Sequence, residues 1–159
     1  MALLLSISYF LNALENPFAF GALIALCALL LSLLRRNYGL SFFITIGITF
    51  ALTHIIKSIY KVARPEDALA LANGYRFPSM HAAIAAALLT SLAWHLYAST
   101  TSRLIKTCIV GSASMLILFV GWTRIILKVH ETIDVVAGIA LGTAISLLLH
   151  YLMRRYNLE

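Results

Sequence analysis

Long apolar runs alternate along the chain with short polar stretches, and this alternation predicts membrane-spanning helices. Each run is close to the roughly 20 residues that an α-helix needs to cross a bilayer. The only sizeable polar loop, residues 61–78, carries two prolines and a glycine, which are typical of a break between helices. The pattern predicts five spans, at residues 17–34, 40–60, 79–98, 104–126 and 131–153.

Residues 1–16, at the start of the chain, are apolar but lie outside the five predicted spans. The chain begins with MALLLSISYFLNAL, without the basic start and small-residue cleavage site of a secretory signal peptide. We expect residues 1–16 to form a helix that lies in the membrane interface or inserts partly. The whole chain, residues 1–159, is expected to be a single all-α domain, a polytopic transmembrane helical bundle.

Composition supports a membrane location. The chain is 62% hydrophobic and 11% charged, with a mean hydropathy of +0.94, which excludes an ordinary soluble domain. The net charge of +6 does not indicate nucleic-acid binding, because the basic residues are scattered between apolar spans. Cys27 and Cys108 lie inside apolar runs and are read as small buried hydrophobes. Gly138 and Gly142 form a small-xxx-small pair suited to close helix contact.

The predicted spans place loop 61–78 and the turn near residues 127–130 on one side of the membrane. Each side then carries six basic residues, so their number alone does not give the orientation. If the bases near the loop serve chemistry, those on the opposite side mark the cytoplasm. The opposite bases are Arg35, Arg36, Arg103, Lys106, Arg154 and Arg155.

Three separated polar stretches meet on the side of loop 61–78. The residues are Lys57 and Arg64, then Ser79 and His81, then Thr123, Arg124, His130 and Asp134. Placing a polar side chain at membrane depth costs free energy unless the side chain has a partner or a functional role. The convergence of these residues therefore indicates one site.

The residue types suggest phosphate chemistry. Three cations, Lys57, Arg64 and Arg124, can gather a phosphate dianion, and a helix that begins at Ser79 adds free amides. His130 and Asp134 are four residues apart and share a helix face, so the carboxylate can orient the imidazole as a nucleophile. A protonated His81 can then donate to the leaving oxygen.

These stretches resemble the signature of the type 2 phosphatidic acid phosphatase family. Lys57-x6-Arg64-Pro65, Pro78-Ser79-Met80-His81 and Thr123-Arg124-x5-His130-x3-Asp134 are similar to its three motifs in order and spacing. The superfamily also contains vanadium haloperoxidases and glucose-6-phosphatase, so the resemblance implies a helical core of that kind.

The resemblance implies a phosphohydrolase that needs no metal or other cofactor. His130 would be the nucleophile, His81 the general acid and Asp134 the orienting carboxylate. The phosphate would be held by Lys57, Arg64, Ser79, Met80 and Arg124. Thr123, Arg76 and His54 are possible accessory residues: Arg76 is a topological anchor or a headgroup contact, and His54 either joins the site or is a satisfied buried histidine.

Two positions depart from the family pattern. The family usually has glycine at Met80 and serine at Thr123, where the hydroxyl is retained. We expect the Met80 side chain to point away from the phosphate, into lipid or onto the tail of the substrate, with an effect on lipid preference. His95 and His150, at the other ends of their spans, are expected at the membrane interface.

Two other functions fit part of this pattern. HETID, residues 130–134, is similar to a degenerate zinc-protease helix, but Asp134 replaces its second histidine and the three cations would have no role. An anion-selective transporter or channel would use the cations, but the sequence has no inverted repeat, and a pore does not need the His130–Asp134 pair.

We therefore expect a lipid phosphatase of a bacterial inner membrane, with its site facing the periplasm or the cell exterior. Its partners would be the bilayer and a lipid phosphate, with no nucleic acid. The candidate substrates are lipid A 1-phosphate, undecaprenyl pyrophosphate, phosphatidylglycerol phosphate and phosphatidic acid. The sequence does not choose among them and does not give the oligomeric state.

Overall fold

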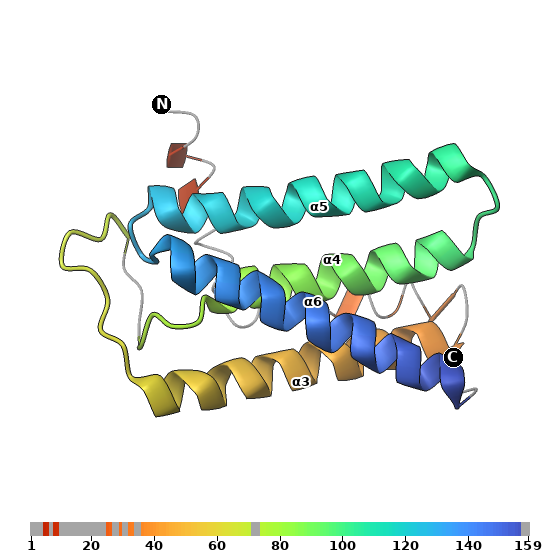
Figure 1. Ribbon diagram of the computed structural model, residues 1–159, viewed down its shortest axis with the longest axis horizontal. Coiled ribbons are helices and arrows are strands. Elements are labelled where there is room, and N and C mark those ends of the chain that lie inside the picture. The colour runs from red at the N-terminus through yellow and green to blue at the C-terminus, as the bar shows by residue number, and fades with distance from the viewer. Residues whose placement is uncertain are drawn as a thin grey trace.

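Four long helices run roughly along one direction (Figure 1). The computed structural model describes residues 5–6, 8–9, 25–26, 29, 32–33, 36–70 and 74–156. All four helices are long and apolar enough to cross a membrane. They are α3 (Arg36–Tyr60), α4 (Met80–Ala98), α5 (Arg103–Ile126) and α6 (Thr132–Arg155).

The prediction of an all-helical membrane bundle is confirmed for this part of the chain. Its last four spans agree with α3 to α6 to within a few residues. The span at 17–34 and the interfacial helix at 1–16 lie almost entirely outside the described residues.

Local sequence explains where these helices begin and end. Ser79 and Ser102 each have extended backbone angles and cap the next helix, accepting hydrogen bonds from the Ala82 and Ile105 amides. Helix α3 ends at Tyr60, and the next residue, Lys61, adopts a left-handed φ of 49° shortly before Pro65. The loop from α3 to α4 and the turn from α5 to α6 therefore lie at the same end of the bundle (Figure 1).

Small residues bring α4 and α6 close together. Ala82, Ala83, Ala86 and Ala87 of α4 are fully buried, and α6 packs more extensively on α4 than any other described helix does. A Cβ added at Gly138 would lie 2.5 Å from the Ser79 carbonyl oxygen, and one at Gly142 would overlap the Ala83 carbonyl oxygen. The expectation of close contact at this glycine pair is confirmed, between helices of one chain.

Buried hydroxyl groups line one face of α3. Thr45, Thr49 and Thr53 are fully buried, and each donates a hydrogen bond of 2.7–2.8 Å to the carbonyl four residues earlier. A hydroxyl that is satisfied within its own helix can be buried without the large cost of an unpaired polar group. This face of α3 can therefore lie against the bundle.

His95 and His150 lie in the interior of the bundle, near the ends of α4 and α6, and their depth at the membrane interface stays a prediction. Both are fully buried, with ring centroids 4.8 Å apart. Ser41 Oγ lies 3.2 Å from His95 Nε2, and Ser91 Oγ lies 2.6 Å from His150 Nε2. These contacts join α3, α4 and α6 at the end opposite loop 61–78 and give Nε2 of each ring a polar partner.

The close contact of α4 with α6 predicts unequal effects of two glycine substitutions. Gly142→Ala forces a methyl group against the α4 backbone, and we expect it to destabilise the protein by about 1–3 kcal/mol. Gly111→Ala in α5 meets nothing within 4 Å and should be neutral or stabilising by up to about 1 kcal/mol. Thermal unfolding of both variants in one detergent measures the difference, and equal melting temperatures would contradict the packing described.

Candidate active site

Hydrogen bonds tie the three polar stretches together at the end of the bundle that carries loop 61–78. The Ser79 amide donates to the Asp134 carbonyl oxygen at 2.9 Å, joining the start of α4 to the start of α6. Arg64 Nη1 donates to the Val129 carbonyl oxygen at 3.0 Å, joining the loop to the turn before α6. The structure thus brings together residues that lie 65 positions apart in the sequence.

Lys57 stands at the end of α3 and is held by the loop that follows. Its Nζ donates to the Arg76 carbonyl oxygen at 3.2 Å and also to the Tyr75 carbonyl oxygen. Arg64 is held in the same way, because its Nε donates to the Gly74 carbonyl oxygen at 3.0 Å. Both cations are thus oriented by backbone oxygens of residues 74–76.

Arg124 is a fully buried cation near the end of α5. Its Nε donates to Thr123 Oγ1 at 3.2 Å, and its Nη2 donates to the Ser8 carbonyl oxygen at 3.4 Å. Thr123 Oγ1 in turn donates to the Val120 carbonyl oxygen at 2.7 Å. The Thr123 hydroxyl thus helps to orient the Arg124 guanidinium.

His130 lies in the turn before α6, and Asp134 lies in the first turn of that helix. They are 4% and 1% exposed. The His130 Nδ1 atom is 3.6 Å from Asp134 Oδ2, and this carboxylate oxygen also accepts a hydrogen bond from the Glu131 amide at 2.8 Å. At 3.6 Å the contact between the two atoms is longer than a hydrogen bond. The carboxylate faces Nδ1, which leaves Nε2 as the atom for chemistry.

The surroundings keep the His130 imidazole neutral. Burial lowers its pKa from the usual 6.5 to about 2, and the nearby charges of Arg64 and Lys57 act in the same direction. His81 and Arg124 add smaller effects. Because only the neutral ring has a free lone pair, His130 is in the form that a nucleophile requires.

The start of α4 supplies two further candidate residues. Ser79 is fully buried and caps the helix, while His81 is partly buried in its first turn. Met80 packs against the buried cluster of Tyr38, Phe42 and Ile46 on α3 together with Ile84 and Ala87 on α4. The Met80 side chain is only partly buried, and its contact with lipid or with the tail of the substrate, with an effect on lipid preference, stays a prediction.

The two other accessory candidates differ from the expectations for them. Arg76 Nη1 contacts Glu131 Oε1 at 2.5 Å and Asp134 Oδ2 at 3.5 Å, with 16% of its side chain exposed. It is therefore an internal partner of the Asp134 carboxylate rather than a free headgroup contact. His54 is exposed on α3 and stacks on Phe50, so it neither joins the site nor is buried.

Sequence reasoning missed the contact between Arg76 and Asp134. The two residues are 58 positions apart, and the only signal was an arginine placed directly before the Phe77–Pro78 pair. It also missed the carbonyl oxygens of Gly74, Val129 and Ser8 that orient Arg64 and Arg124, since no side chain marks a backbone acceptor.

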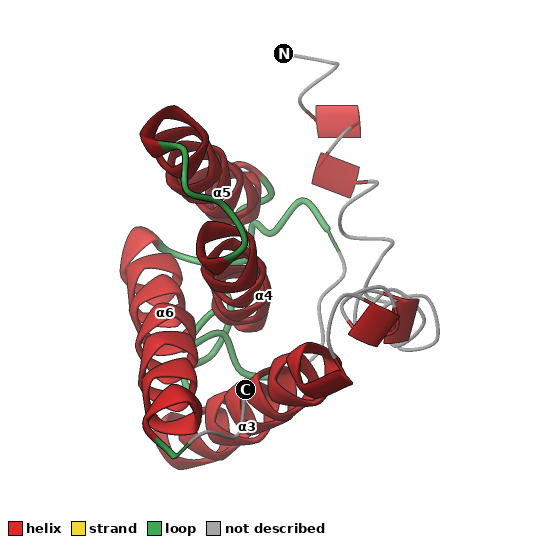
Figure 2. Cartoon of the chain, turned by 90° about the vertical axis from the view of Figure 1, so that its right-hand side faces the viewer, coloured by secondary structure: helices red, strands yellow, loops and turns green. Residues whose placement is uncertain are grey.

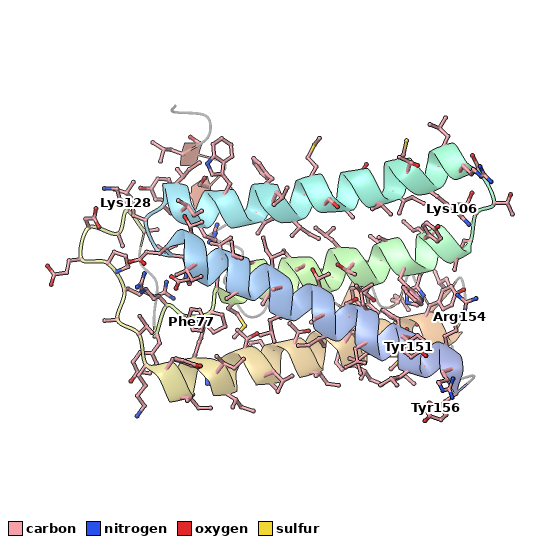
Figure 3. All side chains as sticks on the ribbon, in the orientation of Figure 1. Phe77, Lys106, Lys128, Tyr151, Arg154 and Tyr156 are labelled. Carbon is pink, nitrogen blue, oxygen red and sulfur yellow. The ribbon has the colours of Figure 1, made fainter. Side chains whose placement is uncertain are left out.

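Lys128 lies outside this arrangement, although it is two residues from His130. Its Nζ forms a 2.6 Å ion pair with Asp67 Oδ2, and both side chains are more than half exposed. The Lys128 hydrogen bond and charge lower the pKa of Asp67 below its usual value. Figure 3 shows Lys128 and Phe77 at the same end of the bundle.

The candidate active site combines a neutral histidine with three cations and the start of a helix. Arginine and lysine side chains and helix amides bind phosphate oxygens, and a neutral imidazole can attack phosphorus. Within the described residues, no group of three or more histidine, cysteine or acidic side chains has an arrangement suited to a metal ion.

Comparisons with known proteins agree with the motif spacing. The model of the PAP2 superfamily matches residues 38–158. No curated protein matches the chain. A crystal structure described as the first transmembrane PAP2-type phosphatidylglycerolphosphate phosphatase, from Bacillus subtilis, superposes with a TM-score of 0.86. At 23% identity, the alignment covers 98% of this chain and 79% of the other, so the two proteins share a fold.

The orientation of Arg64 generates a prediction about anion binding. Arg64→Gln removes one of the three cations, and we expect it to weaken the binding of inorganic phosphate at least about tenfold. Lys128→Gln is the matched control, because Lys128 pairs with Asp67 on the surface, and it should leave the affinity unchanged. Calorimetric titration with phosphate measures both, and equal affinities of the two variants would contradict this site.

Proposed function

Because the chain belongs to the PAP2 superfamily, we propose that it is an integral membrane phosphatase that removes phosphate from a lipid headgroup. The observation that carries the proposal is the buried, neutral His130, which has Asp134 on one side of its ring and feels the charges of Arg64 and Lys57. An anion transporter would use the cations, but it would give this pair no task. A phosphatase uses both parts of the arrangement.

In the proposed ground state, Lys57, Arg64 and Arg124 hold the oxygens of the phosphate. Ser79 and the first amides of α4, including that of Met80, complete the set of donors. The carbonyl contacts of Arg64 and Arg124 fix these cations before substrate binds. Such fixed charges stabilise negative charge on the phosphoryl oxygens in the transition state without reorganisation during the reaction.

The proposed first step is attack by His130 Nε2 on phosphorus. The bond between phosphorus and the leaving oxygen breaks, and His81, protonated when the anionic phosphate lies among the three cations, donates its proton to that oxygen. Asp134 stabilises the positive charge that develops on the His130 ring, and Arg76 and the Glu131 amide hold the Asp134 carboxylate in place. The products of this step are a lipid alcohol or lipid monophosphate and a phosphohistidine.

The proposed second step hydrolyses this intermediate. His81, now neutral, takes a proton from water as the water oxygen attacks phosphorus. The bond between phosphorus and nitrogen breaks, inorganic phosphate forms, and His130 returns to its neutral state. His81 has regained the proton that it lost, so the cycle closes with the consumption of one water molecule. No step requires a metal ion.

The position of the site at one end of the bundle supports a lipid substrate. Loop 61–78 and the α5–α6 turn lie where the spans leave the apolar layer, so a phosphate at headgroup depth can reach the cations while its tail stays in lipid. We propose a bacterial inner membrane with the site facing the periplasm or cell exterior. The similar Bacillus subtilis structure is described as a phosphatidylglycerolphosphate phosphatase, which supports phosphatidylglycerol phosphate as one of the four candidate substrates.

Phosphate release from a lipid panel tests the proposal. Purified protein in detergent with a metal chelator should release inorganic phosphate from at least one of lipid A 1-phosphate, undecaprenyl pyrophosphate, phosphatidylglycerol phosphate and phosphatidic acid. We expect His130→Ala to lower kcat at least about 10³-fold, because it removes the nucleophile.

His54→Ala is the matched control, since His54 is exposed and stacks only on Phe50 within α3. It should retain near-normal turnover. Full turnover by the His130→Ala protein would exclude His130 as the nucleophile. A strict requirement for added metal would exclude the mechanism.

A further inference from the structure

A cavity of about 980 Å³ lies between α4, α5 and α6 at the end of the bundle opposite the candidate active site. Helices α5 and α6 approach each other at Gly121, where an added Cβ would lie 2.6 Å from Val135 Cγ1. From there the two helices diverge toward the far end of the bundle (Figures 1 and 2). The cavity is the space that this divergence leaves, and its volume is at the upper end of the range for small-molecule sites.

The cavity is as deep as one leaflet of a bilayer. Along α5 its lining runs from Lys106 at the bundle end to Ile117 near the middle of the helix. Eleven residues of α-helix span about 16 Å, which is close to half of the roughly 30 Å hydrocarbon layer. The deep part is apolar, with Ile117 and Leu118 of α5 opposite Ile139 of α6.

The outer part of the cavity carries positive charge and aromatic rings. Lys106 of α5 and Arg154 of α6 both line it, and Figure 3 shows them at the same end of the bundle. Lys106 Nζ lies 4.4 Å from the centroid of the Tyr97 ring of α4, which holds the ammonium group beside the cavity. None of the described residues that line the cavity is acidic, so its outer part is complementary to an anion.

Positive charge in the lining is specific to the larger cavity, as a second cavity shows. It has about 420 Å³, lies between α4 and α5, and includes Leu92, Leu104 and Cys108 in its lining. No charged side chain is among the described residues that line it. Two cations from different helices therefore mark only the larger of these two cavities.

From this combination we infer that the larger cavity binds one anionic phospholipid that is not a substrate. Its headgroup phosphate lies between Lys106 and Arg154, and one acyl chain extends inward past Ala113 to Ile117 and Ile139. The lipid fills the space between α5 and α6 and so joins two helices that separate at this end. The inference concerns the end of the bundle away from His130 and does not depend on the proposed reaction.

Lipid binding to the purified, delipidated protein tests this inference. Native mass spectrometry measures the affinity for dioleoyl phosphatidylglycerol, a phosphodiester, and for the zwitterionic dioleoyl phosphatidylcholine. We expect one tight site for phosphatidylglycerol. The double variant Lys106→Gln/Arg154→Gln should bind it about 30-fold more weakly, since each cation near the headgroup contributes on the order of 1 kcal/mol.

The matched charge control is Arg103→Gln/Arg155→Gln. These residues are close to Lys106 and Arg154 on the same helices but do not line the cavity, and their loss should leave the affinity unchanged. Ala113→Leu tests the apolar part and should weaken binding by filling the path of the chain. Ser112 lines only the smaller cavity, so Ser112→Leu should not weaken binding.

Four results would overturn the inference. Equal phosphatidylglycerol affinity in the two charge variants would show that Lys106 and Arg154 do not hold the headgroup. Equal affinity for the two lipids would exclude a preference for anions. Unchanged binding by Ala113→Leu, in a variant with normal thermal stability, would show that no acyl chain enters the cavity. Displacement by inorganic phosphate alone would identify an anion site without a lipid, and would also overturn it.

Discussion

The hydrogen bond from the Ser79 amide to the Asp134 carbonyl oxygen joins the two helix starts on which the candidate site depends. It forms only because α4 and α6 approach so closely that Gly138 leaves no room for a Cβ against the Ser79 carbonyl. This contact sets His81, on the first turn of α4, near His130, which directly precedes α6. The backbone packing of α4 on α6 therefore helps to position the proposed acid and the proposed nucleophile.

The same end of the bundle concentrates charge in a place where charge is costly. A cation in a poorly hydrated environment needs polar partners, and Arg64 and Arg124 find theirs in the carbonyl oxygens of Val129, Gly74 and Ser8 and in the Thr123 hydroxyl. These partners leave the cations oriented without neutralising them. Their field, added to burial, keeps the pKa of His130 low. The arrangement thus favours both the binding of an anionic ligand and a neutral His130 side chain.

Motif spacing and apolar runs were sufficient to predict the four described spans and the convergence of the polar stretches. Span length is set by bilayer thickness, and residues at the ends of successive spans must alternate between two sides. The direction in which individual side chains point within the bundle could not be predicted from span length and motif spacing. Met80 turns toward α3, His95 and His150 meet in the interior, and Arg76 reaches Asp134, because each depends on which neighbour lies across a helix interface. The large cavity depends on the divergence of two helices, which leaves no mark on the sequence of either.

The central claim is that His130 forms a covalent bond to phosphorus. Rapid mixing of the protein with a radiolabelled lipid phosphate, a quench in alkali and mass-spectrometric mapping test this claim most directly. We expect a base-stable phosphoryl group on His130 that appears before inorganic phosphate and disappears as phosphate is released. Release of phosphate in a single turnover without any enzyme-bound label, or a label on another residue, would contradict it.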